Sequence, residues 1–196
     1  MVLGTHIFDM MRNFVGDALS CTVQIWQQGR EFKKSDARKA KEDIGLIGGD
    51  EIEAQFGFAN GVFATFTSRA KLRDTLGRWG IDLIGSKGTA RILMDIFPDV
   101  YLLQPGAWTP DGKTDSWVRL KDDPTLNLTA EEKSVARANR RVVDDWLEAI
   151  RANREPICSG YAGMKAVEMV MAVYQAGLSG KRVEFPLIDR RHPLAK

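Results

Sequence analysis

The sequence feature that most constrains the fold is a β-hairpin signal between residues 51 and 68. Two stretches rich in strand-forming residues, 51–58 and 62–68, flank the dipeptide Asn60-Gly61. This dipeptide favours a tight type I′ turn, because both central residues of that turn need a positive φ. Four aromatic side chains are expected to pair across the two strands: Phe56, Phe58, Phe63 and Phe66.

A second hairpin is predicted directly afterwards. Residues 79–84 and 89–94 are the strands, and Gly85-Ser86-Lys87-Gly88 joins them. This glycine spacing does not indicate a phosphate-binding loop, because the segment lacks the Gly-x-Gly-x-x-Gly pattern and opens no helix. Further strands are predicted at residues 20–28, 100–104 and 117–120, and an exposed, charged loop with at most a helical turn at residues 30–43.

A helix is predicted after these strands, beginning at the capping box of Thr129 and Glu132 and extending to about Ala152. Its apolar residues recur at helical spacing and are expected to face inward: Val135, Val142, Val143, Trp146, Leu147 and Ile150. On the same helix, Asp144 and Asp145 lie beside arginines, which favours solvated ion pairs over catalytic carboxylates.

The last helix is expected to begin at Ser159 or Gly160, to end at Gly180 and to pack against the sheet, because it is apolar on most sides. A closing strand is predicted at residues 182–185. The polar tail, residues 188–196, is expected to fray, and its His192 is assigned no role.

The N-terminal segment, residues 4–17, predicts a glycine-led helix with an apolar face of Ile7, Met10, Met11, Phe14 and Val15. Thr5 is placed to cap its start and Gly16 to end it. His6 would then lie in the first helical turn, where a histidine tends to stay neutral and can hydrogen-bond a hydroxyl. Taken alone, His6 is better explained as a residue that merely helps to cap the helix.

The order of these elements predicts an α+β domain with an open, mainly antiparallel sheet and helices packed on one face. Trp26 and the phenylalanines of neighbouring strands indicate a second apolar face, which seldom remains exposed. The pattern therefore predicts that the other face is used for oligomerisation, as a homo-oligomer through the sheet.

Composition excludes several classes of function. The 196 residues are 44% hydrophobic and 28% charged, with a net charge of +2 that gives no argument for a nucleic-acid partner or an anionic membrane surface. Cys21 and Cys158 are expected to be reduced, partly buried thiols, and two histidines make no zinc cluster. With no apolar run long enough for a membrane span and no signal peptide, a cytoplasmic location is expected.

The opening Gly-x-His-x-x-Asp motif, Gly4 to Asp9, resembles the start of the second domain in the Gfo/Idh/MocA family, the glucose-fructose oxidoreductase and inositol dehydrogenase group. The end of the chain resembles the close of the same domain through five blocks in order: residues 143–151, Arg154-Glu155-Pro156, Ser159-Gly160, the helix through Ala166-Val167-Glu168, and Ser179 to Pro186. The resemblance covers nearly the whole chain but only half of the family's usual protein.

The resemblance implies a C-terminal substrate-binding and oligomerisation domain, residues 1–187, followed by the tail, with the N-terminal Rossmann domain absent. It implies an NAD(P)-dependent oxidoreductase that moves a hydride between NAD or NADP and a sugar, polyol or related hydroxyl compound. His6 matches the family's histidine that takes part in proton transfer with the substrate hydroxyl. Asp9 and Arg12 match motif positions and are candidate substrate contacts, although residues three apart on a helix often form only a surface ion pair.

The sequence departs from the family in ways that bear on activity. The aspartate that often lies four residues before the family's histidine is Val2 here, and no dinucleotide fingerprint or Glu-Lys-Pro motif occurs in the chain. The isolated chain is therefore not expected to be a competent dehydrogenase. Two interpretations remain open: the substrate half of a sugar or polyol dehydrogenase with His6 lining a cleft, or a non-catalytic assembly or binding module with His6 plugged by its neighbours.

Overall fold

The computed structural model describes residues 2–41, 44–70, 78–95, 98–103, 116–120 and 129–195. These residues form two compact units, one of residues 1–75 with 159–196 and the other of residues 76–158. All sheet pairings are antiparallel, and the combination of helices with open sheets confirms the predicted α+β class.

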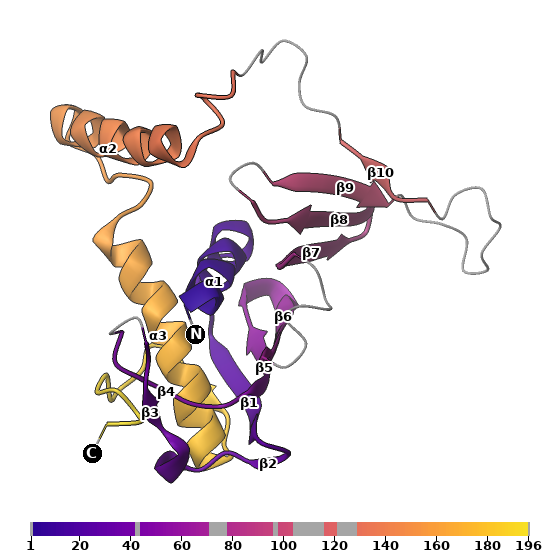
Figure 1. Cartoon of the computed structure of the whole chain (residues 1–196), viewed down its shortest axis with the longest axis vertical. Coiled ribbons are helices and arrows are strands. Elements are labelled where there is room, and N and C mark those ends of the chain that lie inside the picture. The colour runs from indigo at the N-terminus through magenta and orange to yellow at the C-terminus, as the bar shows by residue number, and fades with distance from the viewer. Residues whose placement is uncertain are drawn as a thin grey trace. The chain divides into compact units, whose positions relative to one another are not determined.

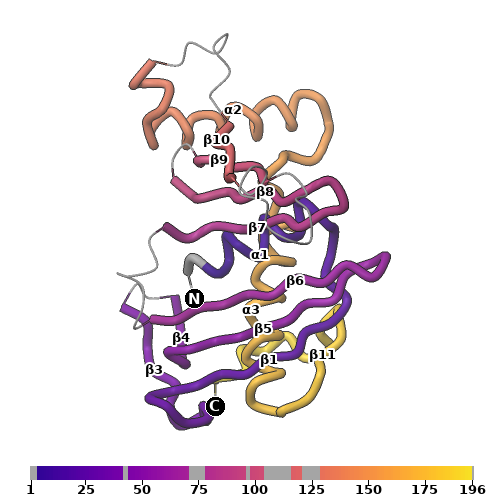
Figure 2. The backbone as a smooth tube through the Cα atoms, turned by 90° about the vertical axis from the view of Figure 1, so that its right-hand side faces the viewer, coloured from indigo at the N-terminus to yellow at the C-terminus, as the bar shows by residue number. Residues whose placement is uncertain are grey.

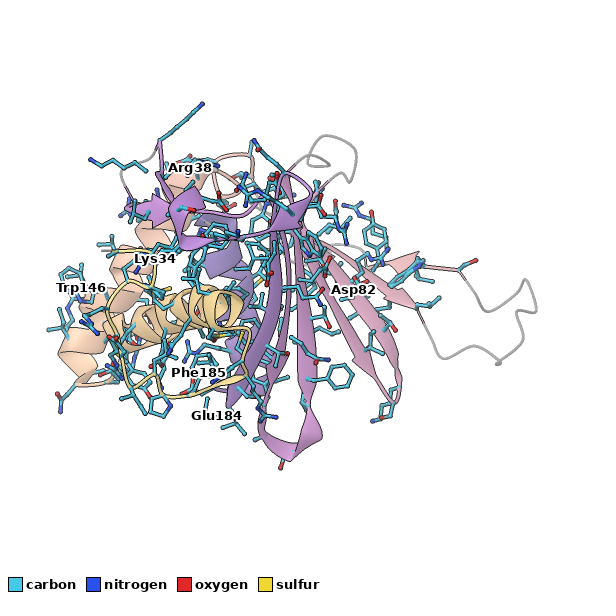
Figure 3. All side chains as sticks on the ribbon, turned by 90° about the horizontal axis from the view of Figure 1, so that it is seen from below. Lys34, Arg38, Asp82, Trp146, Glu184 and Phe185 are labelled. Atoms are coloured by element: carbon cyan, nitrogen blue, oxygen red, sulfur yellow. The ribbon has the colours of Figure 1, made fainter. Side chains whose placement is uncertain are left out.

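The first unit is a sheet with the strand order β11-β1-β5-β6 and two helices on one of its faces (Figure 1). Its regular elements are α1 (Val2–Val15), β1 (Ser20–Gln27), β2 (Arg30–Glu31), η1 (Lys34–Asp36), β3 (Arg38–Lys39), β4 (Leu46–Ile47), β5 (Glu51–Gly57), η2 (Ala59–Gly61), β6 (Phe63–Arg69), α3 (Gly160–Ser179) and β11 (Val183–Glu184). Figure 3, seen from below, shows α1 and α3 on the same side of the strands. The sheet therefore has one covered face and one open face.

The first hairpin forms as predicted. Asn60 and Gly61 both have a positive φ, at 58° and 72°, and the Val62 N–H bonds the Ala59 carbonyl at 3.2 Å across them. The predicted aromatic pairing is wrong, because the register places Phe56 opposite Ala64 and Phe66 opposite Ala54. The aromatic residues meet instead through α1.

Phe8 of α1 is the centre of this core. It is fully buried, and its ring lies edge-on to Phe56 and to Phe66, with centroid distances of 5.0 and 4.8 Å. The helix begins at Val2, so Thr5 lies inside it and is not its cap, while Gly16 ends it as predicted, with φ +87°. The predicted apolar face is also partly wrong: Phe8 is buried, whereas Phe14 is 50% exposed.

α3 has the predicted boundaries. The Ser159 hydroxyl accepts a hydrogen bond from the Ala162 N–H, and Gly180 ends the helix in the left-handed region. Gly177 lets α3 approach β1 closely, since an added Cβ there would lie 2.5 Å from Cδ1 of Ile25.

The tail was expected to fray, and this expectation is wrong for the end of the described tail, where Leu194 is only 3% exposed. Residues 188–191 are exposed. Figure 2 shows the yellow C-terminal segment running close to the strands of the first unit.

The second unit contains a sheet with the strand order β10-β9-β8-β7 and one helix. Its elements are β7 (Gly80–Gly85), β8 (Gly88–Leu93), β9 (Asp99–Leu103), β10 (Val118–Arg119) and α2 (Val135–Ala152). The second hairpin and the two later strands are thus confirmed.

α2 departs from its prediction in two ways. Thr129 and Glu132 make the capping-box bonds, but they close a turn, and the helix itself begins at Val135 with Ser134 as its cap. The stripe predicted to face inward is exposed, from 41% at Leu147 to 61% at Ile150, because the described part of the chain leaves this side of the helix uncovered.

Candidate functional site

The candidate site residues lie along α1. His6 and Asp9 are one helical turn apart and therefore share a face of the helix. His6 is exposed, and the Asp9 side chain is 44% exposed. Because α1 begins at Val2, His6 follows the first turn rather than lying within it, and the predicted proximity to the first free N–H groups is wrong. Asn13, one further turn along, is also exposed and extends this face.

Arg12 lies at the edge of this face and joins α1 to α3. Its side chain is only 12% exposed. The guanidinium donates to the Asp17 carboxylate from Nε and Nη2 at 2.9 and 2.8 Å, and from Nη1 to the Ala162 carbonyl at 3.0 Å. A longer contact of 3.3 Å connects Nη1 to Asp9. Arg12 therefore holds the candidate helix against the start of α3.

A chain of opposite charges continues from this point into α3 and the C-terminal segment. Nζ of Lys165 lies 3.8 Å from Asp17 and 3.5 Å from Glu168. The Glu168 side chain is 6% exposed; its Oε1 accepts the Leu187 N–H at 2.9 Å and lies 3.6 Å from Arg190. The sequence analysis placed Glu168 in a block that resembles the family but missed this network of charges. The signal available in the sequence was the pair of Lys165 and Glu168, two charged residues three positions apart in an otherwise apolar helix.

His6 and Asp9 together have the chemistry to hydrogen-bond a hydroxyl group and to exchange a proton with it. A neutral imidazole presents one N–H donor and one acceptor, and a carboxylate one turn away can accept from a hydroxyl. His6 and Asp9 bring these two functions to one exposed face of α1.

Neither of two shallow grooves on the described surface is lined by His6, Asp9 or Arg12. One lies on the open face of the β1–β5–β6 sheet, between Thr22, Gln24, Glu53, Gln55 and Thr65. This face is mostly polar. Of the aromatic residues expected to make it apolar, Trp26 and Phe63 are exposed, at 42% and 69%, whereas Phe56, Phe58 and Phe66 belong to the core.

The other groove runs beside Trp146 and Cys158. Within it, Asp145 accepts the Ile157 N–H and pairs with Arg154, both at 2.8 Å, and these hydrogen bonds lower its pKa. Asp145 thus tethers the loop after α2, and Arg140 pairs with Asp144 at 3.9 Å, as expected for structural rather than catalytic carboxylates. Cys158 is exposed, contrary to expectation, while Cys21 is fully buried.

The residues described do not fit a dinucleotide or a metal ion. The turn at Ser86 and Lys87 joins two antiparallel strands, β7 and β8, whereas a dinucleotide site needs a glycine-rich turn between a strand and a helix. Among the described ranges, no group of three or more histidine, cysteine or carboxylate side chains could hold a metal. The helices of the described chain include none long and apolar enough to cross a membrane.

The fold is similar to that of several solved oxidoreductases. Levoglucosan dehydrogenase in complex with NADH and levoglucosan has a TM-score of 0.65 and 15% identity, over 94% of this chain and 49% of that chain. Aldose-aldose oxidoreductase from Caulobacter crescentus, complexed with glycerol, has a TM-score of 0.61 and 17% identity, over 93% and 46%. An oxidoreductase from Agrobacterium radiobacter in complex with NAD+, L-tartaric acid and magnesium has a TM-score of 0.59 and 17% identity, over 93% and 47%. At these identities the likeness shows the fold alone.

The chain spans about half the length of these structures. No curated protein sequence matches it. The family model described as "Oxidoreductase family, C-terminal alpha/beta domain" matches residues 1–185, which is nearly the whole chain. The chain therefore belongs to the Gfo/Idh/MocA oxidoreductase family and carries its C-terminal alpha/beta domain.

Proposed function

We propose that the chain is the substrate-binding and oligomerisation domain of an NAD(P)-dependent oxidoreductase that acts on a sugar, a polyol or a related hydroxyl compound. The observation that carries the proposal is the family match over residues 1–185, with the Gly-x-His-x-x-Asp motif on an accessible face of α1. Solved structures with the same fold are described with levoglucosan, glycerol and L-tartaric acid, all of which bear hydroxyl groups.

In this proposal His6 exchanges a proton with the substrate hydroxyl, and Asp9 accepts a hydrogen bond from a neighbouring hydroxyl. Arg12 was predicted to contact substrate. Its bonds to Asp17 and Ala162 support a second role, in which it keeps Asp9 and His6 at a constant position relative to α3. The residue four positions before His6 is Val2 rather than the aspartate often found in the family, so we assign the proton exchange to His6.

The cofactor in this proposal is NAD or NADP, which supplies or accepts the hydride. NAD+ or NADH is named with two of the solved structures above. The described residues do not fit a dinucleotide. The proposal therefore gives residues of this chain a role toward the substrate and none toward the cofactor.

The proposal includes a homo-oligomer formed through the open face of the β1–β5–β6 sheet and a cytoplasmic location. No helix formed by the described residues of the first unit covers this face. It carries both signs of charge, since Arg69 lies 2.6 Å from Glu53 and 3.6 Å from Glu51. A second copy can match such a face by symmetry, with each subunit contributing the same surface.

The test begins with the protein purified from its source cells, with its intact mass measured. Oxidation of a panel of aldoses and polyols is followed with NAD and with NADP, for the native protein and for chromosomal His6→Ala and Asn13→Ala variants. We expect His6→Ala to lower kcat about 10²- to 10⁴-fold, the usual contribution of an acid–base group. Asn13→Ala, on the same helix face, is expected to stay within about twofold of the native rate, as surface changes usually do.

Two outcomes contradict the proposal. One is native protein that oxidises none of the panel with either cofactor, which would favour the non-catalytic assembly or binding module. The other is full activity in the His6→Ala variant, which would remove His6 from the reaction.

A further inference from the structure

The tip of the β5–β6 hairpin carries the dipeptide Asn60-Gly61, and both of its residues are exposed. Asparagine is among the chemically labile residues of proteins. The backbone nitrogen of the next residue can attack its side-chain amide, and glycine hinders this attack least because it has no side chain. The chain has five asparagines, and Asn60 is the one that a glycine follows. Asn60 is therefore the asparagine of this chain with the greatest intrinsic lability.

The reaction converts the side-chain amide of Asn60 into a carboxylate in two steps. First, the Gly61 nitrogen forms a bond to Cγ of Asn60, the bond from Cγ to Nδ2 breaks, and Nδ2 takes up the displaced proton and leaves as ammonia. The product is a five-membered cyclic imide. Water then adds to one imide carbonyl and breaks its bond to the Gly61 nitrogen. Addition at Cγ gives aspartate, whereas addition at the main-chain carbonyl gives isoaspartate, in which the main chain runs through Cβ.

The closed turn holds Asn60 away from the geometry that this reaction needs. Ring closure requires Cβ of Asn60 and the Gly61 nitrogen to be eclipsed about the bond between Cα and the carbonyl carbon. Asn60 has φ 58° and ψ 28°, which places the Gly61 nitrogen nearly opposite Cβ about that bond. The Val62 N–H donates to the Ala59 carbonyl at 3.2 Å and so closes the turn across both residues. Rotation of Asn60 to the reactive ψ must break this hydrogen bond.

The tip is the exposed end of an otherwise well-packed hairpin. Val62 and Phe63 are 40% and 69% exposed, whereas Phe58 and Phe66 are 4% and 7% exposed. The Phe58 N–H donates to the Val62 carbonyl at 2.8 Å, which is the hydrogen bond next to the turn. Exposed segments with few buried apolar contacts open locally at a smaller free-energy cost than the whole domain unfolds. The tip can therefore open while the buried phenylalanines of the hairpin remain packed.

We propose that Asn60 is a latent deamidation site, which the closed β5–β6 hairpin protects and which opening of the hairpin tip exposes to attack by the Gly61 nitrogen. Conversion adds a negative charge at position 60, and isoaspartate also adds an atom to the main chain of the turn. Because turn type and loop length fix the register of a hairpin, the isoaspartate form cannot close the same tight turn. The inference does not depend on the proposed enzymatic function.

Two other positions of the chain are internal references for this reaction. Asn153 is exposed and has a similar backbone conformation, with φ 51° and ψ 46°, but the next residue is Arg154. Gln28 is exposed, has φ 54° and is followed by Gly29, but its longer side chain would have to close a six-membered ring. Asn153 thus lacks the glycine, and Gln28 lacks the favourable ring size.

Peptide mapping by mass spectrometry tests the proposal on the full chain, incubated in mildly alkaline buffer with and without urea. In urea, Asn60 should convert faster than Asn153 and Gln28. Without urea, conversion at Asn60 should be at least about tenfold slower than in urea, because only the open fraction reacts. Thr65→Gly, an exposed change opposite Gln55, weakens the strand and should raise the rate without urea several-fold while leaving the rate in urea unchanged.

Amide hydrogen exchange on the purified isoaspartate form tests the structural consequence. The amides of Phe58 and Val62, which make the hydrogen bonds of the tip, should lose protection. The amides of Ile52 and Ser68, which pair at the other end of the hairpin, are the internal reference and should keep theirs.

Three results would each overturn the proposal. The first is conversion of Asn60 in urea that is no faster than that of Asn153, and the second is conversion that is as fast without urea as with it. The third is a Thr65→Gly chain in which exchange of the Val62 amide is accelerated and conversion of Asn60 is not, since opening of the tip would then not control the reaction.

Discussion

Replacement of Arg12 by methionine should destabilise the first unit, because Arg12 is a structural link as well as a candidate site residue. Methionine retains the length and apolar stem of the side chain and removes the guanidinium. The hydrogen bond to the Ala162 carbonyl, with a charged donor, contributes about 1.5–3 kcal/mol. The pair with Asp17 contributes about 0–1 kcal/mol, since the Asp17 side chain is 42% exposed. Lys165 remains 3.8 Å from Asp17 in the variant, so its attraction to the carboxylate offsets part of the lost Arg12–Asp17 contribution.

The net loss expected for Arg12→Met is about 2 kcal/mol, which at an ordinary urea dependence moves the midpoint of unfolding by about 1 M. The chain has two units, so unfolding is best followed by amide exchange in α1 and α3, which belong to the same unit. Asn13→Ala is the matched control on the neighbouring exposed position and should change stability by no more than about 0.5 kcal/mol.

A double-mutant cycle with Asp17→Asn separates the two contributions, because it measures the Arg12–Asp17 coupling alone. If Arg12→Met lowers stability no more than Asn13→Ala does, the structural role assigned to Arg12 is refuted. The residue would then be available for substrate alone.

Further predictions concern the α3 packing and the two thiols. Gly177→Ala should destabilise the first unit by about 1–3 kcal/mol in urea unfolding, because its Cβ would lie 2.5 Å from Ile25. Gly163→Ala on the same helix, with no atom within 4 Å of the added Cβ, should instead stabilise it by about 0.5–1 kcal/mol; equal effects would contradict the close approach of α3 to β1. At pH 8 a thiol reagent should label Cys158 rapidly and Cys21 only after denaturation, because burial raises the pKa of Cys21 to about 12. Rapid labelling of both thiols in the native protein would be inconsistent with this packing.

Much of the fold could be predicted because its signals are local. Asn60 and Gly61 tolerate the positive φ that a tight turn needs, and both adopt it. Ser159 and Gly180 supply the two ends of α3 for similar reasons. Such preferences depend on a few consecutive residues, so they are legible before any tertiary contact is known.

The candidate site could be predicted only in part. The motif that contains His6 and Asp9 identified the helix and the family. The contacts that connect α1 to α3 were not predictable, since Arg12 and Ala162 are 150 positions apart and Asp17 and Lys165 are similarly distant in the sequence. Their geometry depends on how α1 and α3 pack on the sheet, which helical periodicity alone does not specify.

The sequence by itself determined the elements, their order and the family, because hairpin turns, helix ends and motif spacing act over short distances. The tertiary structure decided which side chains are buried. Phe8 rather than Phe14 enters the core because Phe56 of β5 and Phe66 of β6 pack against its ring. The end of the polar tail is packed for the same kind of reason, since the ring of His192 lies against Tyr174 of α3, a partner that the tail's own sequence does not contain.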